Sequence, residues 1–131
     1  MSGRLYLCGT PIGNLSDFSP RAVETLRSVD LIAAEDTRHS LKLLRHFEIS
    51  KPMVSYFEHN KRERGEQLIQ KLLAGENIAL ITDAGMPAIS DPGEDLVRLC
   101  HEHGIPVSPI PGPCAAVSAL AAGGLPTGRF C

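Results

Sequence analysis

Three stretches of this sequence share a pattern that limits what the chain can fold into. In each stretch a short apolar run breaks into a loop of glycine and proline, and a helix-forming segment follows. The stretches begin at Tyr6, Ile78 and Val107. Short apolar runs bounded by turn residues are typical of strands buried on both faces. Loops after parallel strands meet at the carboxyl edge of a sheet, where open α/β sheets bind ligands. We therefore expect a parallel sheet with one shared crevice at that edge.

The rest of the chain repeats the alternation of strand and helix. We expect strands at residues 5–8, 31–34, 53–56, 78–81 and 107–110. We expect helices that start after the Ser19-Pro20 cap, after Ser40 as a second cap, and at 61–73, 94–103 and 114–122, with Gly75 and Gly104 as stops. Short connections between alternating elements indicate an α/β fold, a doubly wound, mainly parallel five-stranded sheet with helices on both faces.

The composition is that of an ordinary globular domain. The chain has 131 residues, 43% of them hydrophobic and 21% charged, which is enough to bury a core. Neither an apolar signal region nor a stretch of about 18 apolar residues is present, so we expect a cytoplasmic protein. The net charge of −2 gives no global reason to bind nucleic acid, and such a partner would need a local basic patch.

The four cysteines do not form a Cys-x-x-Cys pair. A zinc site or a disulfide framework is therefore not expected, and the thiols are expected to pack as small hydrophobes. His101 and His103 fall on different faces of one expected helix, so we expect no metal.

The end of the sequence is rich in glycine and proline. We expect a ligand-binding domain at residues 1–123 and the start of an interdomain linker at residues 124–131, with a second domain absent from the chain.

The loops do not fit the common nucleotide fingerprints. There is no Gly-Lys-Ser/Thr sequence, and the Gly9 to Gly13 loop lacks the middle glycine of the dinucleotide pattern. Prolines fix φ and remove amide donors, so the loops are preshaped. Loops of this kind suit an adenosine-like ligand held by a few main-chain amides and by apolar walls such as Ile12, Met86 and Ile89. The alternative is that the glycines and prolines only turn the chain.

Five motifs occur along the chain in a characteristic order. They lie at residues 10–15 (TPIGNL), 34–39 (AEDTRH), 83–93 (DAGMPAISDPG), 111–115 (PGPCA) and 124–127 (GLPT). Together they closely resemble the tetrapyrrole methylase superfamily, the class III S-adenosylmethionine (SAM)-dependent methyltransferases. Within that superfamily the sequence is most similar to the ribosomal RNA small-subunit methyltransferase I family.

The resemblance implies a two-domain enzyme, usually a homodimer, that binds S-adenosyl-L-methionine between its domains. This chain would be the first domain, inactive alone. The family's reaction is 2′-O-methylation of a cytidine in small-subunit ribosomal RNA. The cofactor contacts that the resemblance implies fall on Pro11, Ile12, Gly13, Asp83, Ala84, Gly85, Met86, Pro87, Ile89, Cys114 and Ala115.

Two positions depart from the family's pattern. Met86 stands where threonine is usual and Cys114 where serine is usual. Each change removes a hydroxyl group, so affinity for the cofactor falls by about 1 kcal/mol for each hydrogen bond that the family makes through that hydroxyl. Nothing is lost where the family uses main-chain amides instead.

Basic residues suggest how RNA would be held. Arg38, Lys42 and Arg45 are spaced for one side of a helix, and Lys61 and Arg62 open the next helix. Such a stripe can follow phosphates. The alternative is an ordinary solvated helix face.

Aromatic residues lie beside this basic stripe in the sequence. Tyr56 and Phe57 end the expected third strand. Aromatic side chains stack on unpaired bases, so these two are our candidates for holding a base.

Methyl transfer needs positioning and a group that takes the hydroxyl proton. Asp36 is our candidate for that base or for an orienting group, followed by Glu35, because both lie at the end of the second expected strand. The alternative for Asp36 is a helix-capping carboxylate.

Two other functions remain open from the sequence. One is a small-molecule methylase that acts on tetrapyrrole or corrin precursors. The other is a non-catalytic module that binds a nucleotide and docks a partner.

Overall fold

A computed structural model of the chain describes residues 2–88, 92–126 and 128–129. The strands within these residues are Leu5–Cys8 (β1), Leu31–Ala34 (β2), Met53–Ser55 (β3), Ile78–Ile81 (β4) and Val107–Ile110 (β5). The α-helices are Pro20–Ser28 (α1), Thr37–His46 (α2), Lys61–Leu73 (α3), Gly93–Glu102 (α4) and Ala115–Ala122 (α5). A short 3₁₀ helix, Leu15–Asp17 (η1), follows β1.

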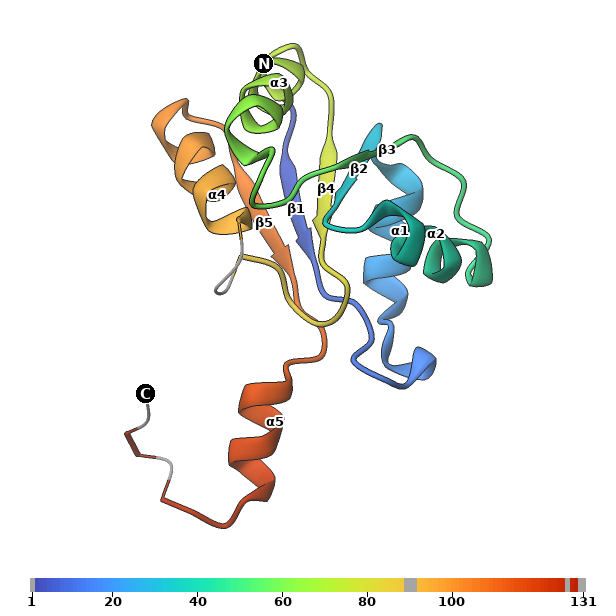
Figure 1. Cartoon of the computed structure of the whole chain (residues 1–131), viewed down its shortest axis with the longest axis vertical. Helices are drawn as coiled ribbons and strands as arrows, with labels where there is room; N and C mark the ends of the chain where they lie inside the picture. The colour runs from blue at the N-terminus through green and yellow to red at the C-terminus, as the bar shows by residue number, and fades with distance from the viewer. Residues whose placement is uncertain (1, 89–91, 127, 130–131) are drawn as a thin grey trace.

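The strands form one sheet in the order β3-β2-β4-β1-β5, and all paired strands are parallel. β1 lies between β4 and β5, so Leu5 pairs with both Ile78 and Val107. The expected α/β, doubly wound, parallel sheet is confirmed. Figure 1 shows the sheet between α3 and α4 on one side and α1 and α2 on the other.

Alternating side chains of the strands supply two separate cores. On one face Leu5, Ile78 and Leu80 pack with α3 and α4. On the other face Ile32 and Ile81 pack with α1 and α2. A strand buried on both faces is apolar along its whole length, which is why β2 and β4 consist only of Leu, Ile and Ala.

Most helix boundaries follow the expected capping signals. The Ser19 side chain accepts a hydrogen bond from the amide of Ala22, with Pro20 at the first helical position. Gly75 and Gly104 follow the ends of α3 and α4 with φ values of +101° and +68°, a conformation in which glycine costs least.

The expected start of the second helix is wrong. α2 begins at Thr37, and its capping residue is Asp36. Ser40 lies inside the helix, is 1% exposed, and its hydroxyl has no hydrogen-bond partner among the described residues. Asp36 accepts from the free amides of the first turn, and Ser40 lies on the buried face of α2, where it cannot act as the cap.

The last helix, α5, differs from the other four in its packing. None of its residues is buried, and Val117 is 55% exposed. Figure 1 shows α5 projecting away from the sheet, beyond the carboxyl ends of the strands. Within the described residues no helix has the length and apolar character required to span a bilayer.

Candidate functional site

Three loops meet where β1, β4 and β5 end. The amide of Gly9 donates to the carbonyl of Ile110 at 3.1 Å. Thr10 and Gly85 form an antiparallel bridge in which each amide donates to the other's carbonyl, at 3.0 and 2.9 Å. Because these bonds join main-chain atoms, they do not in themselves require particular side chains.

Glycine is required where the loops cross. A Cβ atom on Gly9 would lie 2.6 Å from the Cα of Gly112 and 2.9 Å from the sulfur of Met86. Gly85 has a φ of +81°, which L side chains rarely adopt. We call the contact of Gly9, Thr10, Gly85 and Gly112 the loop crossing.

Thr10 is a structural residue of the crossing that the sequence analysis did not single out. It is fully buried, and its hydroxyl lies 3.3 Å from the carbonyl of Thr82 and 3.4 Å from that of Gly85. The side chain thus ties the β1 loop to the β4 loop. A threonine at the end of a strand gives no local sign of such a role.

Three hollows open around the crossing. The β5 hollow, of about 450 Å³, is lined by Leu7, Met86, Pro87, Ala88, Glu94, Val97 and Cys114. The α2 hollow, of about 350 Å³, is lined by Pro11, Gly13, Leu15, His39, Lys42, Leu43, His46 and Asp83. The middle hollow, of about 360 Å³, is lined by Ile12, Asp17, Gly112, Pro113 and Ser118. The single crevice expected from the sequence is therefore divided, because the buried bridge between Thr10 and Gly85 fills its centre.

The cofactor residues implied by the resemblance are distributed among these hollows. Seven of them line one of the three hollows: Pro11, Gly13 and Asp83 line the α2 hollow, Ile12 lines the middle hollow, and Met86, Pro87 and Cys114 line the β5 hollow. Gly85 belongs to the crossing, and the carbonyl of Ala84 accepts a 3.0 Å hydrogen bond from the Thr82 hydroxyl. Ala115 is the first residue of α5. Ile89 lies outside the described residues.

Asp36 has a clear structural role. One carboxylate oxygen, Oδ1, accepts from the amides of Arg38 at 3.0 Å and His39 at 3.4 Å. This is the capping alternative that the sequence left open. Glu35 is exposed, and it lines a very small cavity together with Tyr56 and Gly93.

The predicted basic stripe is split between the two faces of the sheet. α2, with Arg38, Lys42 and Arg45, packs on one face of the sheet through Leu44, while α3 packs on the opposite face. The reason is topological: β2 to β3 and β3 to β4 run in opposite directions across the sheet, and right-handed crossovers then place their helices on opposite faces.

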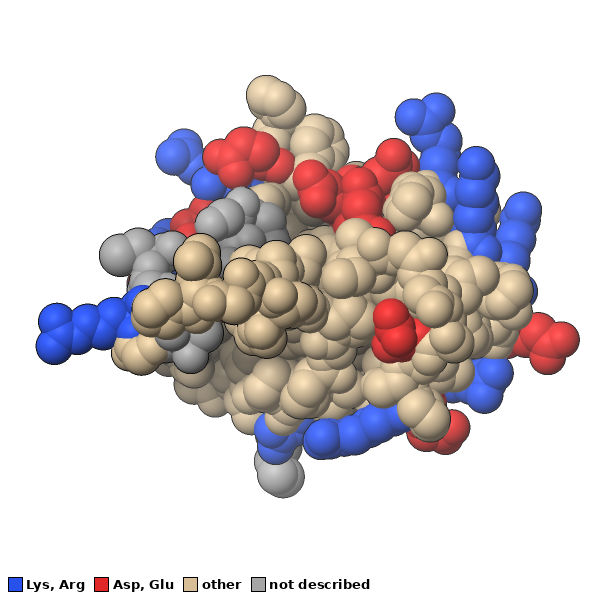
Figure 2. All heavy atoms as spheres, turned by 90° about the horizontal axis from the view of Figure 1, so that it is seen from below, with Lys and Arg blue, Asp and Glu red and all other residues tan. Residues whose placement is uncertain are grey.

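The α2 group is free to meet a partner. The Arg38 side chain is 94% exposed, and Lys42 and Arg45 are exposed as well. In the view onto the carboxyl edge, Figure 2 shows Lys and Arg side chains projecting on the right, the side on which Figure 1 places α1 and α2, around a largely uncharged centre.

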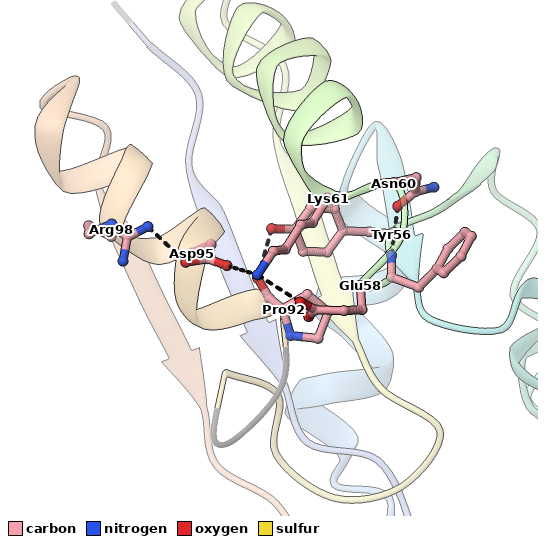
Figure 3. A network of polar contacts seen from close by, with 8 residues as sticks. Tyr56, Glu58, Asn60, Lys61, Pro92, Asp95 and Arg98 are labelled. Atoms are coloured by element: carbon pink, nitrogen blue, oxygen red, sulfur yellow. Dashed lines mark hydrogen bonds and ion pairs between the residues drawn. The ribbon is translucent and has the colours of Figure 1, made fainter.

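The basic residues of α3 are in a different environment. Lys61 lies between carboxylates, with its Nζ 2.6 Å from Asp95 of α4 and 3.0 Å from Glu58. Figure 3 shows these groups, with Arg98 on the far side of Asp95 at 2.7 Å. Hydrogen bonding to Asp95 and then to Glu58 raises the pKa of Lys61, and the bond from Lys61 lowers the pKa of Asp95. Arg62 is exposed beside this network.

The expectation that Tyr56 stacks on a base is wrong. Its side chain is packed in the core, the residue is 2% exposed, and its hydroxyl donates to the carbonyl of Pro92 at 2.7 Å. Phe57 is half-buried, in an edge contact with His59. Asn60 shapes this turn, because its side chain accepts from the amide of Phe57 and donates to the carbonyl of Ser55.

The described cysteines are unpaired thiols. Cys8 and Cys100 are buried, and burial raises their pKa values to about 12 and about 11. They therefore pack as neutral, unreactive groups. Across the described part of the chain no cluster of three His, Cys, Asp or Glu side chains is arranged to hold a metal ion.

The fold and the site together define a class of protein: a doubly wound α/β domain with ligand hollows at the carboxyl edge of its sheet. Family comparison makes the assignment specific. The family of tetrapyrrole (corrin/porphyrin) methylases matches residues 4–130, and the chain belongs to this family.

Several curated relatives carry the name ribosomal RNA small subunit methyltransferase I. The protein from Synechocystis is 60% identical over 98% of this chain, and that from Escherichia coli O157:H7 is 57% identical over 98%. The chain spans 46% and 45% of their respective lengths. A structure of uroporphyrin-III C-methyltransferase from Thermus thermophilus, complexed with S-adenosylhomocysteine, has a TM-score of 0.68 at 24% identity, covering 98% of this chain and 54% of that one.

Proposed function

We propose that this chain is the cofactor-binding part of a SAM-dependent methyltransferase that acts on small-subunit ribosomal RNA, with the 2′-hydroxyl of a cytidine as acceptor. The relatives' names and the family support the reaction class. The observation that carries the proposal is the loop crossing, which holds three loops at the carboxyl edge through main-chain bonds and leaves an apolar hollow beside it.

The β5 hollow fits the cofactor in size and chemistry. Its volume of about 450 Å³ lies in the range of small-molecule sites, about 300–1,000 Å³. Met86, Pro87 and Val97 supply apolar walls, and Cys114 lies at the start of α5. SAM supplies an electrophilic methyl group on a sulfonium. These residues would hold its adenosine and methionine portions and exclude water.

The acceptor side lies on α2. Arg38, Lys42 and Arg45 carry positive charge without a buried ion pair, and Arg62 of α3 would meet RNA on the other face. Lys61 is the weakest member of the predicted group, because Asp95 and Glu58 already neutralise it.

Asp36 and Glu35 are the proposed candidates for removing the proton from the acceptor hydroxyl. The oxygen Oδ1 of Asp36 is engaged by two amides, so only Oδ2 is left to orient or deprotonate a hydroxyl. Replacing Asp36 with asparagine in a longer chain would keep the cap and remove the charge.

We place the protein in the cytoplasm, as a homodimer in which a further domain after residue 123 completes the cofactor cleft. Sedimentation of a longer chain would test the dimer. Activity on isolated small ribosomal subunits, set against activity on porphyrinoids, would test the acceptor class.

The direct test of the cofactor site is an NMR titration of the 131-residue chain with S-adenosylhomocysteine, with NAD as the control ligand. We expect shifts at residues 84–88 and 112–116 with the first ligand only. The Cys114→Ser variant restores the hydroxyl that is usual in the family. If that hydroxyl donates a hydrogen bond to the ligand, we expect the variant to bind S-adenosylhomocysteine about fivefold more tightly. Shifts with NAD alone would refute the methyltransferase assignment.

A further inference from the structure

The α2 hollow is a second site, on the other side of the loop crossing from the β5 hollow. It lies between the β1 loop, the β4 loop and one face of α2. His39, Lys42, Leu43 and His46 recur at helical spacing on that face. The walls are mixed: Pro11, Leu15 and Leu43 are apolar, His39, Lys42 and His46 are basic, and Asp83 is acidic.

We infer that the α2 hollow binds one nucleotide of a single-stranded RNA, and that the imidazole of His39 recognises its ribose 2′-hydroxyl. This inference rests on the proposed function, because the nucleotide would belong to the RNA substrate. It adds a location and a recognition group that neither the family nor the sequence motifs supplied.

The hydrogen bond of His39 fixes which ring nitrogen is available. Nε2 lies 3.2 Å from the main-chain carbonyl of Asp83. A carbonyl oxygen only accepts, so Nε2 must carry the hydrogen. In the neutral imidazole Nδ1 then has the free lone pair. It accepts a hydrogen bond from a hydroxyl, and a deoxyribose has no hydroxyl to donate at that position.

The surrounding charges suit a nucleotide. Lys42 lines the hollow, and Arg38 and Arg45 flank it on the exposed side of α2. These cations attract phosphate and favour binding of any strand, whether ribose or deoxyribose. The imidazole of His46, which contacts the ring of Phe47 edge-on at 5.0 Å, offers a flat surface for a base.

Asp83 adds a preference among bases. Its carboxylate lines the hollow and only accepts hydrogen bonds. A base with an exocyclic amino group can donate to it, whereas a uracil oxygen in the same place would meet like charge. The hollow therefore prefers a base with an exocyclic amino group, such as cytosine.

The test uses single-stranded oligocytidine in its ribo and deoxy forms, with binding followed by fluorescence anisotropy and by the ring signals of His39 and His46. We expect the ribo form to bind about fivefold more tightly, the effect of one hydrogen bond. The His39→Phe variant keeps a flat ring but has neither Nδ1 nor any other hydrogen-bond acceptor, so ribo and deoxy forms should bind it equally. The ring spectra should also identify His39 as the Nε2–H tautomer in the free chain.

Two further variants separate the parts of the site. Lys42→Gln should weaken both strands by the same factor, and the charge-matched control Lys71→Gln, on α3, should change neither. Asp83→Asn should reduce the preference for oligocytidine over oligouridine.

Three outcomes would overturn the inference: equal binding of ribo and deoxy strands by the unmodified chain, a ribo preference that survives in His39→Phe, or shifts near Lys61 and Arg98 in place of the α2 hollow. Failure of the proposed cofactor site would show separately, as a missing response of residues 84–88 to S-adenosylhomocysteine.

Discussion

The two halves of the carboxyl edge are held together in different ways. Where β4, β1 and β5 end, main-chain hydrogen bonds join the loops, and glycines allow them to cross. Where β2 and β3 end, side chains do the work: Asp36 caps α2, and Tyr56 reaches the start of α4.

The difference shows what each half can tolerate. The first half can change its side chains, as Met86 and Cys114 do, but has no room for a Cβ atom at the crossing. The second half has room for substitution, but each polar partner that is lost leaves another group unsatisfied. Four variants test this contrast.

The largest effect should come from Gly9→Ala. The new methyl group would lie 2.6 Å from the Cα of Gly112, so the two chains must separate, and we expect a loss of about 3 kcal/mol in the free energy of unfolding. Urea denaturation measures it. Gly128→Ala is the control, because no other described residue places an atom within 4 Å of its Cβ position. Equal stability of the two variants would show that the crossing is not tightly packed.

Tyr56→Phe should have the next largest effect. It removes the 2.7 Å hydrogen bond to the carbonyl of Pro92 without creating a cavity, and we expect about 1.5 kcal/mol of destabilisation. The control is Tyr6→Phe, whose hydroxyl has no hydrogen bond among the described residues. If Tyr6→Phe lowers the free energy of unfolding as much as Tyr56→Phe does, the hydrogen bond from Tyr56 to Pro92 is not the cause of the loss.

Replacing Asp36 distinguishes a cap from a charge. Asp36→Ala leaves the amides of Arg38 and His39 without their acceptor, so we expect about 1 kcal/mol of destabilisation. Asp36→Asn preserves an acceptor and should cost only a few tenths. If both variants lose the same stability, the negative charge, and not the cap, supports α2. Thermal unfolding followed by circular dichroism measures both.

The smallest effect concerns Lys61 and Asp95. The lowered pKa of Asp95 means that its contribution is present above its ordinary pKa and is lost as the pH falls through the lowered value. The raised pKa of Lys61 means that its contribution is present below its ordinary pKa and is lost as the pH rises through the raised value. The pair therefore stabilises the fold between about pH 4 and pH 10.

The measurement compares the unmodified chain with Asp95→Asn. We expect a modest stability difference at pH 7 that shrinks at pH 2 and in 1 M salt, because both side chains are near the surface. A difference that is independent of pH would contradict the ion-pair explanation.

The sequence predicted the elements of this fold well and their side-chain partners poorly. Strands such as β4 and stops such as Gly75 were predictable, because a buried strand and a left-handed glycine each leave a local pattern. The partnership of Tyr56 with Pro92, and that of Lys61 with Asp95, joins segments far apart in the chain. No local pattern records such pairs.

The two incorrect expectations have the same origin. Ser40 and Asp36 are both good caps, and only the position of the buried face of α2 decides between them. Tyr56 has the residue type that stacks on bases, but the topology places it under α4, in the core. Candidate site residues in the loops were easier to propose from the sequence, because glycine and proline mark the loops directly.

The strand order also bears on how the chain acquires its structure. β2 and β3 are neighbours in the sequence and in the sheet, so they can pair early. β1 is the first strand of the chain, yet both of its partners, β4 and β5, come last. Pairing between distant segments slows folding, because a long loop must close first. We therefore expect the N-terminal strand to wait, unpaired, until β4 has been synthesised, and the loop crossing, which also needs the loop after β5, to be the final part to form.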